Sequence, residues 1–157
     1  MIALRLVHLI ESHSEDLAEG LVRKLERCSR TSGLRLVHAQ EIRERSREIY
    51  HNLSDWLLTK TDDDIERVYV ALGRRRAQQG VPLSAVCWAL FLTEENLWEF
   101  LELEGLRERP LDILGGFELL RRLDKFFDQA VYFATVGYES YLKEQERTRA
   151  EHFAHSI

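Results

Sequence analysis

Apolar residues recur every three or four positions along most of the chain, which predicts amphipathic helices with one buried face each. Since only one short segment could form a strand and a single strand has nothing to pair with, the pattern predicts an all-α protein, a five-helix antiparallel bundle with a long C-terminal helix. The predicted helices cover residues 2–28, 40–58, 62–79, 82–102 and 112–150.

Local signals set the expected boundaries of these helices. Ser12 and Glu15 have the spacing of a capping box, so the first segment is either one kinked helix or two helices. Residues 29–39 begin with Ser, Thr and Gly and are expected to form the longest irregular connection. Thr61 is a good N-cap for the third helix, and Gly80 is typical of a residue that ends one.

The helix predicted over residues 82–102 is apolar on more than one face, so it is either central or buries its second face on another subunit. Glu94 lies on its main apolar stripe, and a buried carboxylate needs a cation or several donors. Arg76, on the preceding antiparallel helix, is the predicted partner. Arg76 and Glu94 are therefore the candidates for a polar core pair or a ligand-binding pair.

A homodimer is expected to form through this apolar helix and the last one. The candidate interface residues are Trp88, Leu92, Phe127 and Val131. A helix over residues 112–150 would be ~58 Å long at 1.5 Å per residue, which exceeds what one small domain covers. We therefore expect a helical domain over residues 1–142 and a helical linker over residues 143–157, leading towards an output domain that this chain lacks.

Composition and charge limit the classes of function that this chain can have. The chain has 157 residues and a net charge of −5, with no basic stripe of the kind that nucleic-acid binding needs. It shows neither a membrane-spanning stretch nor a signal peptide, and its two cysteines do not form a disulfide framework. These features predict a cytoplasmic protein that binds neither nucleic acid nor membrane.

Catalytic motifs are not evident. The sequence contains no His-x-x-x-His pair, no Gly-rich phosphate loop and no Gly-x-Ser-x-Gly elbow. We expect no enzymatic activity, no metal site and no cofactor. One alternative is a small-molecule or haem-binding sensor module, with its pocket between the third, fourth and fifth helices. Another, which rests on a resemblance given below, is a helical regulatory segment of a transcription regulator.

One segment resembles a known family. Residues 72–83 read LGRRRAQQGVPL, and the apolar helix that follows ends in NLWEFL at residues 96–101. This combination resembles the N-terminal sensory domain of RsbRD-type proteins, although a similar motif occurs in PucR- and CdaR-like transcription regulators.

The resemblance implies a non-enzymatic, all-helical input domain of a bacterial signal-transduction protein. Such domains precede STAS output domains, histidine kinases or other output modules. Related input domains have a globin-like fold without haem and form dimers. The implied partners are thus a second copy and a downstream output domain or partner signalling protein.

Overall fold

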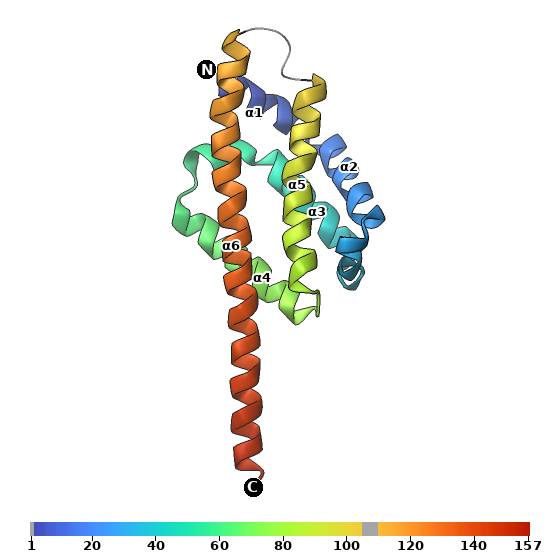
Figure 1. Cartoon of the computed structure of the whole chain (residues 1–157), viewed down its shortest axis with the longest axis vertical. Helices are drawn as coiled ribbons and strands as arrows, with labels where there is room; N and C mark the ends of the chain where they lie inside the picture. The colour runs from blue at the N-terminus through green and yellow to red at the C-terminus, as the bar shows by residue number, and fades with distance from the viewer. Residues whose placement is uncertain (1, 105–109) are drawn as a thin grey trace.

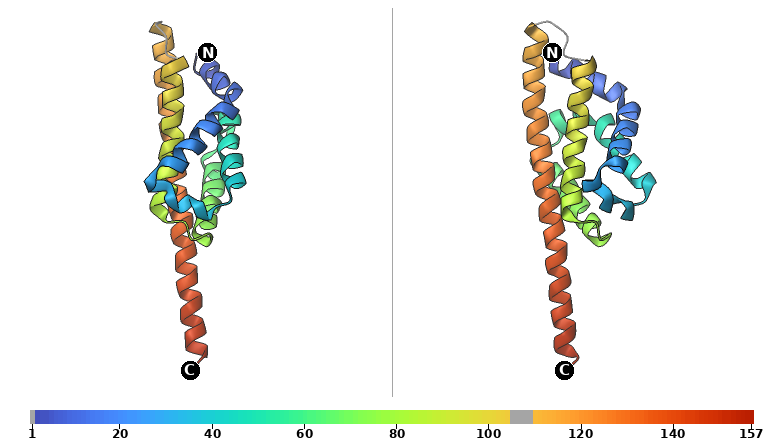
Figure 2. Two further views of the ribbon diagram at one scale, coloured as in Figure 1. Left: turned by 90° about the vertical axis from the view of Figure 1, so that its right-hand side faces the viewer. Right: turned by 45° about the vertical axis from the view of Figure 1, so that its right-hand side comes forward.

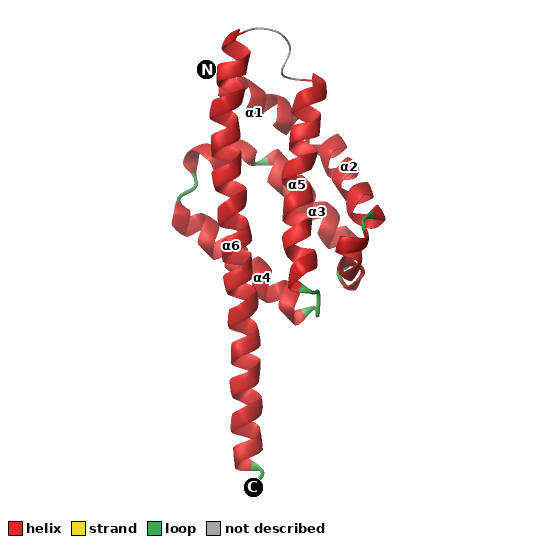
Figure 3. Cartoon of the chain, viewed as in Figure 1, coloured by secondary structure: helices red, strands yellow, loops and turns green. Residues whose placement is uncertain are grey.

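The structure is a computed structural model that describes residues 2–104 and 110–157. Every regular element in this part of the chain is helical, which confirms the predicted all-α class (Figures 1 and 3). The elements are α1 (Ile2–Ser12), α2 (Ser14–Arg27), the 3₁₀ helix η1 (Ser29–Leu36), α3 (Ala39–His51), the π-helix η2 (Asp55–Thr59), α4 (Asp62–Gln78), α5 (Leu83–Glu104) and α6 (Pro110–His155).

The helices form two layers. Figure 2 shows α5 and α6 side by side and antiparallel in one layer, while α1, α3 and α4 cover one face of that pair. The α2 helix contacts both α3 and α5 and so connects the layers. Most of the opposite face of the α5–α6 pair carries no other described helix, although the end of α2 and η1 cross α5 at its edge (Figure 2). The lower part of α6 continues beyond all the other helices (Figure 1).

The α4–α5 corner, residues 79–82, forms as its sequence predicts. Thr61 caps α4 through a complete capping box with Asp64, in which each side chain bonds the other residue's backbone N–H. At the other end Gly80 adopts φ 76°, and the Gly80 and Val81 amides donate to the carbonyls of Ala77 and Arg76. This pair of bonds is a Schellman motif, which needs glycine because other residues rarely adopt a positive φ.

Two boundaries differ from the sequence-based expectation. The first segment does divide at Ser12, but no capping box forms, because the Ser12 hydroxyl donates back to the Leu9 carbonyl. Residues 29–36 are a 3₁₀ helix rather than an irregular connection. Thr31 holds it to the end of α2, since its buried hydroxyl donates to the Leu25 carbonyl at 2.7 Å.

The closest contact between helices is the crossing of α4 and α6. A Cβ added to Gly73 would overlap the backbone carbonyl of Ala134, and one added to Gly137 would overlap the carbonyl of Val70. The two helices therefore touch backbone to backbone, with a glycine on each side of the contact. This crossing holds α6 against the body just before α6 leaves it.

A buried polar network joins the layers beside the apolar core. The Tyr50 hydroxyl donates to the Thr93 carbonyl at 3.0 Å, and the Asn96 amide donates to the Tyr50 oxygen and to the Leu17 carbonyl. These bonds satisfy polar groups that would otherwise be costly to bury. The largest fully buried apolar side chains around them include Ile10, Leu21, Leu53, Leu97, Leu123 and Phe127.

The glycine crossing gives a first prediction. Gly137→Ala should destabilise the fold by about 2–3 kcal/mol, because the new methyl group cannot fit without separating α4 from α6. Gly20→Ala is the matched control, since a Cβ there meets its nearest atom at 3.7 Å, and alanine in an open helical position should stabilise by about 0.5–1 kcal/mol. Urea unfolding of both variants measures the difference, and equal effects would contradict the backbone contact.

Candidate functional site

Arg76 is the buried cation of the fold, with 6% of its surface exposed. Its guanidinium donates to the Glu41 carboxylate of α3 at 2.7 Å and to the Gln79 side-chain oxygen at 2.8 Å. Glu41 also accepts two bonds from Arg75, at 2.6 and 2.9 Å. One carboxylate thus serves two guanidinium groups and ties α3 to the C-terminal end of α4.

This arrangement shows that the predicted pairing of Arg76 with Glu94 is wrong. Arg76 turns towards α3, whereas Glu94 lies on the side of α5 that faces α6. The sequence showed that both residues lie on apolar stripes but not that the stripes face different neighbours. Glu41 was overlooked because it belongs to a charge-rich stretch of α3, most of which is exposed.

Electrostatics favours the ionised form of Glu41. The hydrogen bonds from Arg75 lower its pKa most, burial opposes them, and Arg76 adds a further lowering, so that the pKa falls to about 2. Burial lowers the pKa of Arg76, and the bond to Glu41 opposes that change. The Glu41 carboxylate is therefore the main compensation for the buried charge.

Removing the Glu41 carboxylate should destabilise the fold. Glu41→Gln should destabilise the protein by about 3 kcal/mol at pH 7, because Arg76 would remain buried without a counter-charge. The contribution of Glu41 to the free energy of unfolding should be complete above pH 4.5. It should be lost as the pH falls towards about 2, since folding depresses the pKa of Glu41. Denaturant unfolding with the exposed Glu44→Gln as control tests this, and a loss below 1 kcal/mol would contradict it.

Glu94 has the opposite electrostatic environment. Burial raises its pKa most, and Asp124 and Asp128 of α6 raise it further, while a bond from Trp98 lowers it, with a net value of about 7. No lysine or arginine forms an ion pair with Glu94 in the described part of the chain. The seam between α5 and α6 thus carries acidic groups that repel one another when ionised.

This cluster predicts a pH-dependent stability. Because folding raises the pKa of Glu94 above its ordinary 4.5, its protonation favours the folded state, and that stabilisation is lost as the pH rises through about 7. Glu94→Gln should therefore be more stable than the wild type at pH 8 and equal to it at pH 5. Melting temperatures across this range, with the exposed Glu95→Gln as control, measure the effect. A gain in stability at pH 5 as large as that at pH 8 would contradict it.

The uncovered face of α5 and α6 carries aromatic side chains. Trp88 stacks on Phe91 with ring centroids 4.6 Å apart, and the Arg30 guanidinium lies 4.3 Å from the centroid of Trp88. Phe91 is 46% exposed and Tyr132 of α6 is 64% exposed. Exposed aromatic groups of this size are typical of a surface that meets another protein.

The structure changes the list of interface candidates. Leu92 and Phe127 are only 9% and 2% exposed, so both belong to the core of a single chain and their assignment to a subunit interface is corrected. Trp88 and Val131 are half-buried and remain candidates. Phe91 and Tyr132 were missed because helical periodicity alone does not distinguish the covered face of a two-faced apolar helix from the uncovered one.

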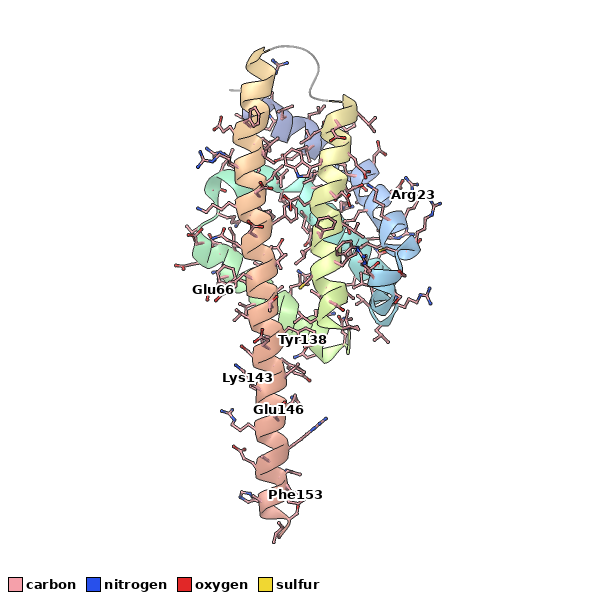
Figure 4. All side chains as sticks on the ribbon, in the orientation of Figure 1. Arg23, Glu66, Tyr138, Lys143, Glu146 and Phe153 are labelled. Atoms are coloured by element: carbon pink, nitrogen blue, oxygen red, sulfur yellow. The ribbon has the colours of Figure 1, made fainter. Side chains whose placement is uncertain are left out.

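Side chains from the α4–α5 corner hold α6 where it leaves the body. The Tyr138 hydroxyl donates to the Val81 carbonyl at 2.6 Å, and Arg74 donates twice to Glu144, at 3.0 and 2.7 Å. Beyond this point the side chains of α6 are exposed. Figure 4 shows Tyr138 at the edge of the body, with Lys143, Glu146 and Phe153 on the projecting segment.

The structure is that of a small all-α domain with one projecting helix. Over residues 15–153 the chain matches the family described as the RsbT co-antagonist protein rsbRD N-terminal domain, and it belongs to that family. Its members are signalling input domains, so the predicted resemblance is confirmed. A search of curated proteins and a search of solved structures each gave no match.

Two further observations concern the described residues alone. None of their helices combines the length and the apolar character needed to cross a lipid bilayer. No three His, Cys, Asp or Glu side chains among them lie close enough together to hold a metal ion.

Proposed function

We propose that this chain is a non-enzymatic, dimeric signal-input domain that passes its signal through α6 to an output module. Family membership supports the input role. The observation that carries the proposal is the exposed end of α6, which extends from a tightly held crossing and makes no contact with the rest of the described chain (Figure 1). The output module would be a STAS domain, a histidine kinase or a separate signalling protein.

The α4–α6 crossing supports transmission by rigid movement. Two helices in backbone contact cannot slide or rotate against each other by small steps, because packed interfaces resist continuous deformation. A displacement of α4 would therefore move α6 with it. The Arg74–Glu144 bonds and the Tyr138–Val81 bond extend this connection to the point where α6 leaves the body.

The dimer would form through the uncovered face of α5 and α6. Trp88, Phe91, Val131 and Tyr132 supply the aromatic and aliphatic groups that are enriched at the centres of protein interfaces. Pairing this face with its copy would give a four-helix arrangement with both projecting segments of α6 side by side. Such a pairing would bring a signal from each subunit to one output.

Single charges placed on this face test the dimer. Phe91→Glu and Tyr132→Glu should each raise the dimer dissociation constant about 30-fold or more, as expected for the loss of ~2 kcal/mol at an interface centre. Neither change should unfold the chain, because both side chains are largely exposed. Sedimentation equilibrium measures the constant, and circular dichroism checks the fold.

Leu103→Glu is the matched control, since Leu103 is an exposed apolar residue of the same helix, about 120° around the helix axis from Phe91. It should leave the dissociation constant unchanged. A wild-type chain that stays monomeric at high concentration, or equal effects of all three substitutions, would contradict this interface.

A further inference from the structure

A groove of about 650 Å³ lies between η2, the start of α4 and the first half of α6. Pockets of roughly 300–1,000 Å³ are typical of small-molecule sites, so the groove has room for a ligand. It differs from the pocket expected between the third, fourth and fifth predicted helices, because η2 forms one of its walls and α5 forms none.

Aromatic side chains form the floor of this groove. Trp56 of η2 packs on Phe126 of α6 with ring centroids 5.6 Å apart, and Tyr69 of α4 contacts both rings from behind, at 6.0 and 5.8 Å. Phe117 of α6 also lines the groove and is 60% exposed. The groove thus offers aromatic rings to a ligand that can stack on them.

Cations stand on both walls of the groove. Lys60 ends η2, and its ammonium group lies 5.9 Å from the centroid of the Trp56 ring. The α6 wall supplies Arg121, Arg122 and Lys125, all of them exposed. Residues 121 and 125 are one helical turn apart, so their side chains lie on the same face of α6.

These four cations outnumber the carboxylates of the groove. Among the described residues that line it, only Asp62 and Glu118 carry negative charge, which leaves an excess of two positive charges. Both carboxylates already have partners. Glu118 accepts a bond from Arg122 at 3.3 Å, and Asp62 accepts one from Gln129 at 3.1 Å.

Carboxylates outside the groove do not pair with the remaining cations. Asp124 and Asp128 of α6 lie beside Glu94, on the side that faces α5. Asp63 and Glu66 of α4 are exposed and lie outside the lining. In the part of the chain that the structure describes, the three cations other than Arg122 form no ion pair. A groove with this excess of one charge concentrates ligands of the opposite charge.

We propose that this groove binds an organic dianion with an aromatic body. The body would stack on Trp56 and Phe117, and the acidic groups would accept charge-assisted hydrogen bonds from Arg121 and Lys125 on one wall and from Lys60 on the other. Two negative charges match the excess of two positive charges. Aromatic dicarboxylates and aromatic compounds with one phosphate group belong to this class.

The groove offers no ligand for a haem iron. Its lining contains no histidine, cysteine, methionine or tyrosine, the side chains that ligate haem iron in proteins. Of the two forms of the sensor-module alternative, only the small-molecule form therefore fits this groove.

A ligand in the groove would join α4 and η2 to α6. The same two helices, α4 and α6, meet again at Gly73 and Gly137, nearer to the exposed end of α6. The ligand would thus add contacts to the helix pair through which the proposed signal passes. Its role as the sensed signal rests on the proposed function, but its binding does not.

Calorimetric titration of the purified chain at low salt and pH 8 tests the binding. The probes are 2,6-naphthalenedicarboxylate and 1-naphthyl phosphate, compared with 2-naphthol, which lacks the charge, and with sulfate, which lacks the ring. At least one naphthalene dianion should bind saturably, and about tenfold or more tightly than either comparison compound. The double variant Arg121→Gln, Lys125→Gln should weaken it by about tenfold or more. Phe117→Ala should weaken it several-fold.

The projecting segment of α6 supplies matched controls. Lys143→Gln, Arg147→Gln makes the same change in net charge at the same spacing, and Phe153→Ala removes another exposed ring. Both should leave the dissociation constant unchanged, and circular dichroism checks the fold of every variant. Equal weakening by both double variants overturns the groove proposal, as does the absence of dianion binding at millimolar concentration.

Two further outcomes are decisive. A peptide with four glutamates around a Phe-Leu pair that binds this groove more tightly than either dianion overturns the small-molecule assignment in favour of an acidic protein partner. Light scattering on the same samples separates the groove from the dimer. A dimer that binds no dianion overturns the groove alone, and a monomer that binds one overturns the dimer alone.

Discussion

The backbone contact between α4 and α6 is the constraint on which the rest of the structure depends. Helices normally pack with their axes 8–10 Å apart because side chains stand between them. At Gly73 and Gly137 the side chains are missing, so the two backbones meet. This close approach lets the C-terminal end of α4 reach α6 with Arg74, and lets Tyr138 reach the Val81 carbonyl in the corner. The longest helix, which also contacts α1, α5 and η2, is thereby held to the body just before its exposed segment begins.

The second constraint is the compensation of a buried charge. The Glu41 bonds to Arg75 and Arg76 connect α3 to the C-terminal end of α4. A buried guanidinium is tolerated only with such a partner.

The sequence predicted where the helices lie better than it predicted which helices pack against one another. Thr61, Gly80 and the periodic apolar stripes depend on local chemistry, and the helices they predict are present. The partner of Arg76 was not predictable, because it depends on which neighbouring helix each side of α4 faces and an apolar stripe does not encode that. The glycine crossing was equally hidden, since it arises only when distant segments meet.

These features converge on α4. Arg76 bonds Glu41 of α3, whereas Val70 and Gly73 touch the backbone of α6, so α4 contacts both neighbours directly. The hydrogen-bonded backbone of a helix deforms less than the side-chain contacts around it. The glycines also remove the side chains that would otherwise separate the two backbones at the crossing. A displacement of α4 would therefore reach α6 more directly here than through an ordinary helix–helix interface.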